Sequence, residues 1–129
     1  MQMGARLLAA IFVGGTAGGL ARATLEHSRP WDGHGWPWVT LAVNLAGTAL
    51  LAYVITSLSH RPCARPLLGI GLCGALTTFS TLQLEAIQLA DNGHAVLGAT
   101  YACTSIAAGL LIARTVSRHA GSSRRGPQP

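Results

Sequence analysis

The sequence contains few charged residues. Asp, Glu, Lys and Arg make up only 10% of its 129 residues, against about 25% in a typical soluble domain. It has four acidic residues, and every one of its nine basic residues is arginine. Aromatic residues account for only 5% of the chain, while half of it is hydrophobic and 16 residues are glycine. This balance argues against a soluble globular core and favours closely packed helices in a membrane.

Several further absences exclude classes of function. The arginines are scattered at the ends of apolar segments and form no basic stripe with interleaved aromatics, which argues against nucleic acid as a partner. The three cysteines have no CxxC spacing, so no disulfide framework is predicted. The chain has no arrangement of nucleophile and base, so we expect neither an enzyme nor a catalytic cofactor. Five histidines lie in predicted loops or in the tail without the spacing of metal ligands: His27, His34, His60, His94 and His119.

Four apolar stretches predict membrane-spanning helices, because each has the roughly 17–25 residues that cross a bilayer core. They cover residues 5–23, 37–58, 66–90 and 94–116. We therefore expect an all-α membrane protein with one domain over residues 1–119 and a disordered polar tail over residues 120–129. In the first connection, tryptophans cluster where a span begins, which predicts an interfacial anchor formed by Trp31, Trp36 and Trp38.

The first apolar stretch permits two interpretations. Its beginning and the run Ala21-Arg22-Ala23 loosely resemble a secretory signal peptide with an A-x-A cleavage site. However, four glycines form two overlapping GxxxG patterns, which are a helix-packing surface in membranes: Gly14, Gly15, Gly18 and Gly19. A signal peptide does not need such a surface, so we prefer a retained membrane span.

Polar residues inside a membrane span are costly and must face a partner, a cavity or a pore. In the second span, Thr40, Asn44 and Thr48 repeat every four residues and share one helix face. The Asn44 amide offers two N–H donors that suit an anion, but an interhelical hydrogen bond explains this residue equally well. In the fourth span, Tyr101 and Ser105 have the same spacing, which by itself favours packing.

The third span contains the unusual run GALTTFST at residues 74–81. Glycines weaken the first half of this span, and hydroxyl side chains follow at mid-membrane, where they can bond an opened backbone. Broken helices at this depth expose carbonyl groups to cations and N–H groups to anions. We therefore predict a break at Gly74–Thr78 that serves an ion. The positive edge of the Phe79 ring could attract an anion, although packing is the commoner role of such a ring.

Asn44 within VNLAG and the run GLCGALTTFSTLQLE, which ends at Glu85, resemble the Fluc family of fluoride channels, also called CrcB. The runs GGTAGGLAR in the first span and Y-x-x-x-S in the fourth extend the resemblance over nearly all four spans. The resemblance implies an antiparallel, dual-topology dimer in which two protomers enclose two narrow pores. It also implies a structural sodium ion at the dimer centre, held by the main-chain oxygens of Gly74 and Thr77.

The same resemblance implies roles for individual side chains. Asn44 would donate to fluoride, and Phe79 would offer its ring edge. Arg22 matches an arginine of the pore vestibule, where its charge concentrates anions. Glu85 matches an acid beyond the break, for which packing or capping is an equal interpretation. Four hydroxyl residues match the polar track of the pore: Thr40, Ser80, Tyr101 and Ser105.

The chain departs from the family pattern in three places. Leu82 stands where a second aromatic ring is usual, Ala75 replaces a second glycine, and Gly109 interrupts the hydroxyl track of the fourth span. We expect a fluoride channel that lowers cytoplasmic fluoride by passive export. One alternative is a small four-helix proton-coupled antiporter of cations or drugs, for which Glu85 is the sole intramembrane acid. Another is a membrane subunit without transport.

The distribution of arginine predicts the orientation of the chain. Four spans place both termini and the second connection on one side, which carries Arg6, Arg61, Arg65, Arg114, Arg118, Arg124 and Arg125. The opposite side has only Arg22 and Arg29. This bias predicts a plasma-membrane protein of a prokaryote with both termini in the cytoplasm. An antiparallel homodimer would need half of the chains to insert against the bias, so we hypothesise a heterodimer with a related chain of opposite bias. Insertion of this chain both ways is the alternative.

Overall fold

The structure, a computed structural model, describes residues 2–58 and 60–122. Its elements are all helical: α1 (Gln2–Ser28), α2 (Trp38–Ser57), η1 (Pro66–Cys73), α3 (Gly74–Leu76), α4 (Phe79–Asp91) and α5 (Ala95–Ser122). Four stretches are long and apolar enough to cross a membrane: Gly4–Ser28, Trp38–Ser57, Pro66–Asp91 and Ala95–Gly121. The predicted all-α membrane architecture with four spans is confirmed. The predicted tail lies outside the described residues from residue 123 onward.

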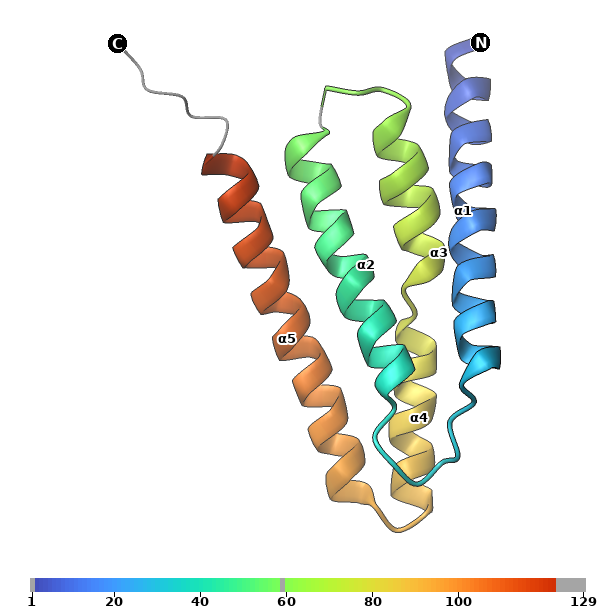
Figure 1. Cartoon of the computed structure of the whole chain (residues 1–129), viewed down its shortest axis with the longest axis vertical. Helices are drawn as coiled ribbons and strands as arrows, with labels where there is room; N and C mark the ends of the chain where they lie inside the picture. Colours follow the sequence, from blue (N-terminus) through green and yellow to red (C-terminus); the bar gives the residue numbers. More distant parts are fainter. Residues whose placement is uncertain (1, 59, 123–129) are drawn as a thin grey trace.

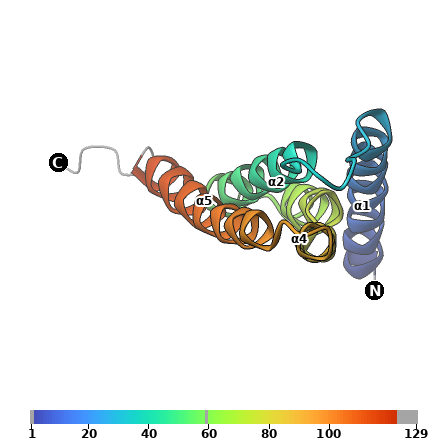
Figure 2. The ribbon, with the colours of Figure 1, turned by 90° about the horizontal axis from the view of Figure 1, so that it is seen from below.

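The four spans run alternately up and down (Figure 1). The start of α1, the end of α2, the start of η1 and the end of α5 lie at one end of the molecule, and the α1–α2 and α4–α5 connections lie at the other. Seen end-on, the helices form an open row, with α5 at one side, α2 and α4 between, and α1 at the other side (Figure 2). Accordingly, α5 packs against α2 and α4, whereas α1 packs mainly against η1 and α3. The third span is therefore the centre of the molecule.

Glycine allows α1 to lie directly on η1. Gly14 and Gly18 are buried, and a Cβ atom on either residue would collide with backbone carbonyl groups of η1. From the other side, a Cβ on Gly71 would lie 2.6 Å from the Ile11 carbonyl oxygen. One of the two GxxxG patterns therefore packs helices within the chain. Gly19, from the other pattern, has no atom of the described residues near its Cβ position.

A small buried core lies between α2, α4 and α5. Leu41, Leu82 and Tyr101 form it, and Trp36 packs against them. The Trp36 ring meets the Tyr101 ring edge-on, with centroids 5.6 Å apart. Trp36 therefore belongs to the core and not to the predicted interfacial anchor, whereas Trp38 is exposed as an anchor requires.

Gly18→Ala should weaken the contact between α1 and η1, because the added Cβ would collide with the η1 backbone. We expect the free energy of unfolding to fall by about 1–3 kcal/mol, the usual cost of overpacking, in a denaturant titration of the protein in detergent micelles. Gly19→Ala is the matched control and should be close to neutral. If both variants are as stable as the parent chain, Gly18 does not hold α1 on η1.

Candidate ion site at the broken third span

The third span breaks at Thr77 and Thr78, as predicted. Both residues have extended backbone, with ψ of 145° and 118°, and α4 begins immediately afterwards at Phe79. Thr78 caps the new helix, because its Oγ1 accepts a hydrogen bond from the Thr81 N–H at 3.1 Å. The same Oγ1 contacts the hydroxyl groups of Ser80 and Thr81. The hydroxyl run thus restarts the helix after the break.

Asn44 of α2 holds the opened backbone. Its Oδ1 accepts a hydrogen bond from the Thr78 N–H at 2.8 Å, and its Nδ2 donates to the Thr78 carbonyl at 3.0 Å. A side-chain amide thereby supplies both bonds that a neighbouring strand would give to one residue. Because the Asn44 amide has two N–H groups, one of them is not used in this pair.

Two carbonyl groups lose their helical partners at the break. In a continuous α-helix, the Thr78 and Thr81 N–H groups would donate to the carbonyls of Gly74 and Thr77, four residues earlier. Here the Thr78 N–H donates to Asn44 and the Thr81 N–H donates to Thr78 Oγ1. The Gly74 and Thr77 carbonyls are therefore released from the helix ladder. They are the two oxygens that the family resemblance implies as sodium ligands.

Arg22 reaches the break from α1. Its Nε donates to the Ala75 carbonyl at 3.1 Å, and its Nη1 lies 3.7 Å from Glu26 Oε1 on the same helix. The Ala75 carbonyl near the break thus accepts a hydrogen bond from the Arg22 guanidinium, and this bond ties α1 to the first half of the broken span. The positive charge of Arg22 consequently lies close to the opened backbone.

A second polar cluster joins α2, α4 and α5. The buried carboxylate of Glu85 accepts a hydrogen bond from Thr40 Oγ1 at 2.6 Å on one oxygen and from Tyr101 OH at 2.7 Å on the other. Ser105, one turn further along α5, donates to the Tyr101 carbonyl of its own helix. Two hydroxyls that the family pattern assigns to one polar track are thus held together by an acid whose role the sequence left open.

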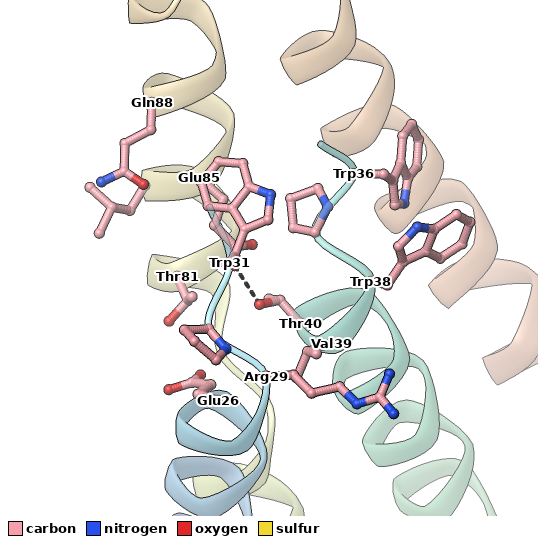
Figure 3. A pocket seen from close by; sticks show the side chains of 13 residues that line it. Glu26, Arg29, Trp31, Trp36, Trp38, Val39, Thr40, Thr81, Glu85 and Gln88 are labelled. Carbon is pink, nitrogen blue, oxygen red and sulfur yellow. Dashed lines mark hydrogen bonds between the residues drawn. The ribbon is translucent and has the colours of Figure 1, made fainter. Parts of the chain in front are cut away.

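A pocket of about 420 Å³ opens onto this second cluster. Figure 3 shows the Thr40–Glu85 hydrogen bond at the pocket. Arg29 and Trp31, both from the α1–α2 connection, also line the pocket. The lining also includes Gln88 from α4. The pocket connects Glu85 and Thr40 to the end of the molecule where the α1–α2 connection lies.

Several predicted site residues face outward from the single chain. Phe79 is 63% exposed, and Gly74 and Ser80 are exposed as well. Leu82, in contrast, is buried in the core and only 5% exposed. An exposed hydroxyl and freed carbonyls in the middle of a span are costly in lipid. This face therefore requires a covering protein or a water-filled space.

The structure divides the predicted site residues between two clusters. Asn44 and Ser80 both contact Thr78, whereas Thr40 and Tyr101 meet at Glu85. Sequence reasoning missed Thr78 as the centre of the first cluster. Its position directly before a new helix, three residues ahead of another threonine, was the available indication, since threonine is a favoured N-cap residue.

These features define a class: a four-span membrane protein whose third span is broken and held open by an amide of the neighbouring span. Residues 9–116 match the family model described as CrcB-like protein, Camphor Resistance (CrcB). The chain therefore belongs to the CrcB-like protein family.

Individual relatives agree with this assignment. The chain is 50% identical over 110 residues to "Fluoride-specific ion channel FluC 1" of Mycolicibacterium paratuberculosis, covering 82% of this chain and 83% of the relative. It is 39% identical over 117 residues to the protein of the same name from Cutibacterium acnes, covering 85% and 82%. The match to "Fluoride-specific ion channel FluC" of Chlorobaculum tepidum is 39% over 101 residues, covering 75% and 80%. The resemblance to the CrcB family is confirmed.

Proposed function

We propose that this chain is a fluoride-specific ion channel that lowers cytoplasmic fluoride by passive export. The observation that carries the proposal is its 50% identity, over most of both chains, to a protein named as such a channel. Neutral HF crosses membranes and dissociates inside, so the trapped anion needs an exit and no catalytic group. The chain is a channel and not an enzyme, and it crosses the membrane several times.

The donors of the site suit a desolvated anion. Asn44 keeps one N–H beyond its bond to Thr78, and the exposed start of α4 presents the Phe79 ring and the Ser80 hydroxyl side by side in sequence. A ring edge carries partial positive charge, and Arg22 raises the local concentration of anions. Together with these groups, three hydroxyl residues of the second and fourth spans line the proposed pore: Thr40, Tyr101 and Ser105.

Glu85 has a positioning role in this proposal. Its two oxygens accept hydrogen bonds from the hydroxyls of Thr40 and Tyr101, which fixes the orientation of both hydroxyls in the proposed polar track. A proton-coupled antiporter would instead need this carboxylate to exchange protons for cations. Because both of its oxygens already accept hydrogen bonds and the relatives are named as channels, no observation favours the antiporter or a subunit without transport.

The pores form between two antiparallel chains in our proposal. Phe79, Ser80 and Gly74 are exposed in the middle of the third span, where lipid cannot satisfy polar groups. A second chain that covers this face would enclose the exposed donors in two narrow passages. Lipid surrounds the remaining apolar surface.

A structural sodium ion fits the break, and we include it in the proposal. Sodium is a hard cation, and rings of backbone oxygens coordinate such cations in channel filters. The Gly74 and Thr77 carbonyls are available because their helical N–H partners bond elsewhere. Bound sodium would supply positive charge to these oxygens and link the opened backbone to the second chain.

Fluoride efflux from liposomes that contain the purified channel tests the function. Wild-type channels should release fluoride passively, while Asn44→Asp should release it at least roughly tenfold more slowly, because it loses a hydrogen bond worth about 1.5–3 kcal/mol to a charged group and places a carboxylate opposite an anion. Phe79→Ala should also slow the release, because it removes the positive ring edge. Ile87→Ala is the control, since Ile87 is a 57% exposed apolar residue of the same helix. Normal efflux from Asn44→Asp would refute the pore assignment.

Removal of sodium should shorten the lifetime of the dimer, because the freed carbonyls of Gly74 and Thr77 would lose their cation. We expect potassium and lithium to substitute poorly. The measurement is subunit exchange between differently labelled dimers in buffers that contain sodium, potassium or lithium. An equal exchange rate in all three buffers would show that no structural sodium ion holds the chains together.

The orientation of the C-terminus tests the proposed heterodimer. The arginine bias predicts that nearly all chains place both termini in the cytoplasm, which an antiparallel homodimer does not allow. Labelling of a C-terminal tag in intact and permeabilised cells measures the two orientations. A near-equal split, together with full fluoride efflux from this chain alone, would refute the heterodimer.

A further inference from the structure

Two histidines that are far apart in sequence face each other in the structure. His34 lies in the α1–α2 connection, His94 lies directly before α5, and both residues are exposed. Their ring centroids are 6.2 Å apart, and the ring planes make an angle of 67°. The sequence gives no indication of this pair, because it has none of the short spacings typical of metal ligands.

Hydrogen bonds hold the backbone on both sides of the pair. Asp32 Oδ1 accepts a hydrogen bond from the His34 N–H at 3.1 Å, which forms a tight turn. Asn92 Nδ2 donates to the Gly33 carbonyl at 2.9 Å and so joins the two connections. His94 follows Asn92 by two residues. Both imidazoles are therefore presented from segments that already contact each other.

The distance between the rings suits a metal ion placed between them. An ion bonded to one nitrogen of each imidazole at about 2.0–2.1 Å would hold the centroids roughly 5 Å apart at a tetrahedral bond angle, and farther apart at a wider angle. The observed separation of 6.2 Å is slightly longer than the tetrahedral value, so binding needs only a small approach of the two rings. Since exposed side chains change rotamer quickly, the rings can turn their nitrogens toward a shared ion.

Negative charge lies near the pair. Asp32 and Asp91 line one hollow of about 410 Å³ at the same two connections. Both carboxyl groups are exposed at this end of the molecule, and their negative charge attracts cations.

We propose that His34 and His94 form a binding site for a divalent first-row transition-metal ion such as Zn²⁺. Imidazole is a preferred ligand of Zn²⁺, Cu²⁺ and Ni²⁺, whereas carboxylates and water suit Mg²⁺ or Ca²⁺. In residues 2–58 and 60–122, no three His, Cys, Asp or Glu side chains are placed to hold a metal ion together. The site therefore has two protein ligands, and water completes the coordination.

A bound ion would crosslink the α1–α2 connection to the start of α5. The first of these segments leads into α2 and Thr40, and the second leads into α5 and Tyr101, so the ion would stiffen the end of the molecule where the 420 Å³ pocket opens. This binding does not depend on the proposed fluoride transport. It can be measured without any fluoride flux.

Calorimetric titration with Zn²⁺ tests the site in the full chain, purified without a histidine tag. Cys63→Ser serves as the background, because Cys63 is an exposed thiol that could also bind zinc. We expect one Zn²⁺ per chain. His34→Ala and His94→Ala should each weaken binding by about tenfold or more, since even outer-shell changes at metal sites cost 10–100-fold.

His60→Ala is the matched control, because His60 is exposed and belongs to the connection between α2 and η1, which lies at the opposite end of the molecule (Figure 1). It should leave the affinity unchanged, and the double variant His34→Ala/His94→Ala should lose the site entirely. Ring resonances of His34 and His94 should shift together in NMR spectra as Zn²⁺ is added. Equal affinities in all three single variants, or a loss in only one of His34→Ala and His94→Ala, would overturn the proposal.

Discussion

The two hydrogen bonds between the Asn44 amide and the Thr78 backbone are the contact on which the break in the third span depends. Because the Thr78 N–H donates to Asn44 at 2.8 Å, it is not available to the Gly74 carbonyl four residues earlier. The third span stays open, the Thr78 hydroxyl caps the following helix, and two carbonyls lose their helical N–H partners. One side chain of the second span thus determines the backbone chemistry of the third.

Each half of the broken span is fixed to different neighbours. The first half lies directly under α1, because Gly18 leaves room for the η1 backbone, and Arg22 bonds the Ala75 carbonyl. The second half is held by Glu85, which joins α4 to hydroxyls of α2 and α5. The break is therefore positioned from both sides although its own backbone is not helical. Such support keeps the opened backbone in place without a continuous helix.

The four spans could be predicted because length and scarcity of charge identify membrane helices directly. The break was also predictable, since glycine and hydroxyl residues at mid-membrane are unusual in an intact span. Contacts between distant segments were not. The spacing of Asn44 fitted an anion ligand and an interhelical bond equally, and only the structure shows the bond to Thr78. In the same way, no periodicity indicates that Glu85 joins three helices or that His34 faces His94.

Amide exchange at Thr78, followed by NMR in wild type and Asn44→Ala, is the most direct test of the Asn44–Thr78 contact. We predict that the Thr78 N–H is protected in the wild type and exchanges faster in Asn44→Ala. The Thr81 N–H should keep its protection in both, because it bonds the Thr78 hydroxyl. If the Thr78 N–H stays equally protected without Asn44, it bonds the Gly74 carbonyl in a continuous helix, and the proposed origin of the break is wrong.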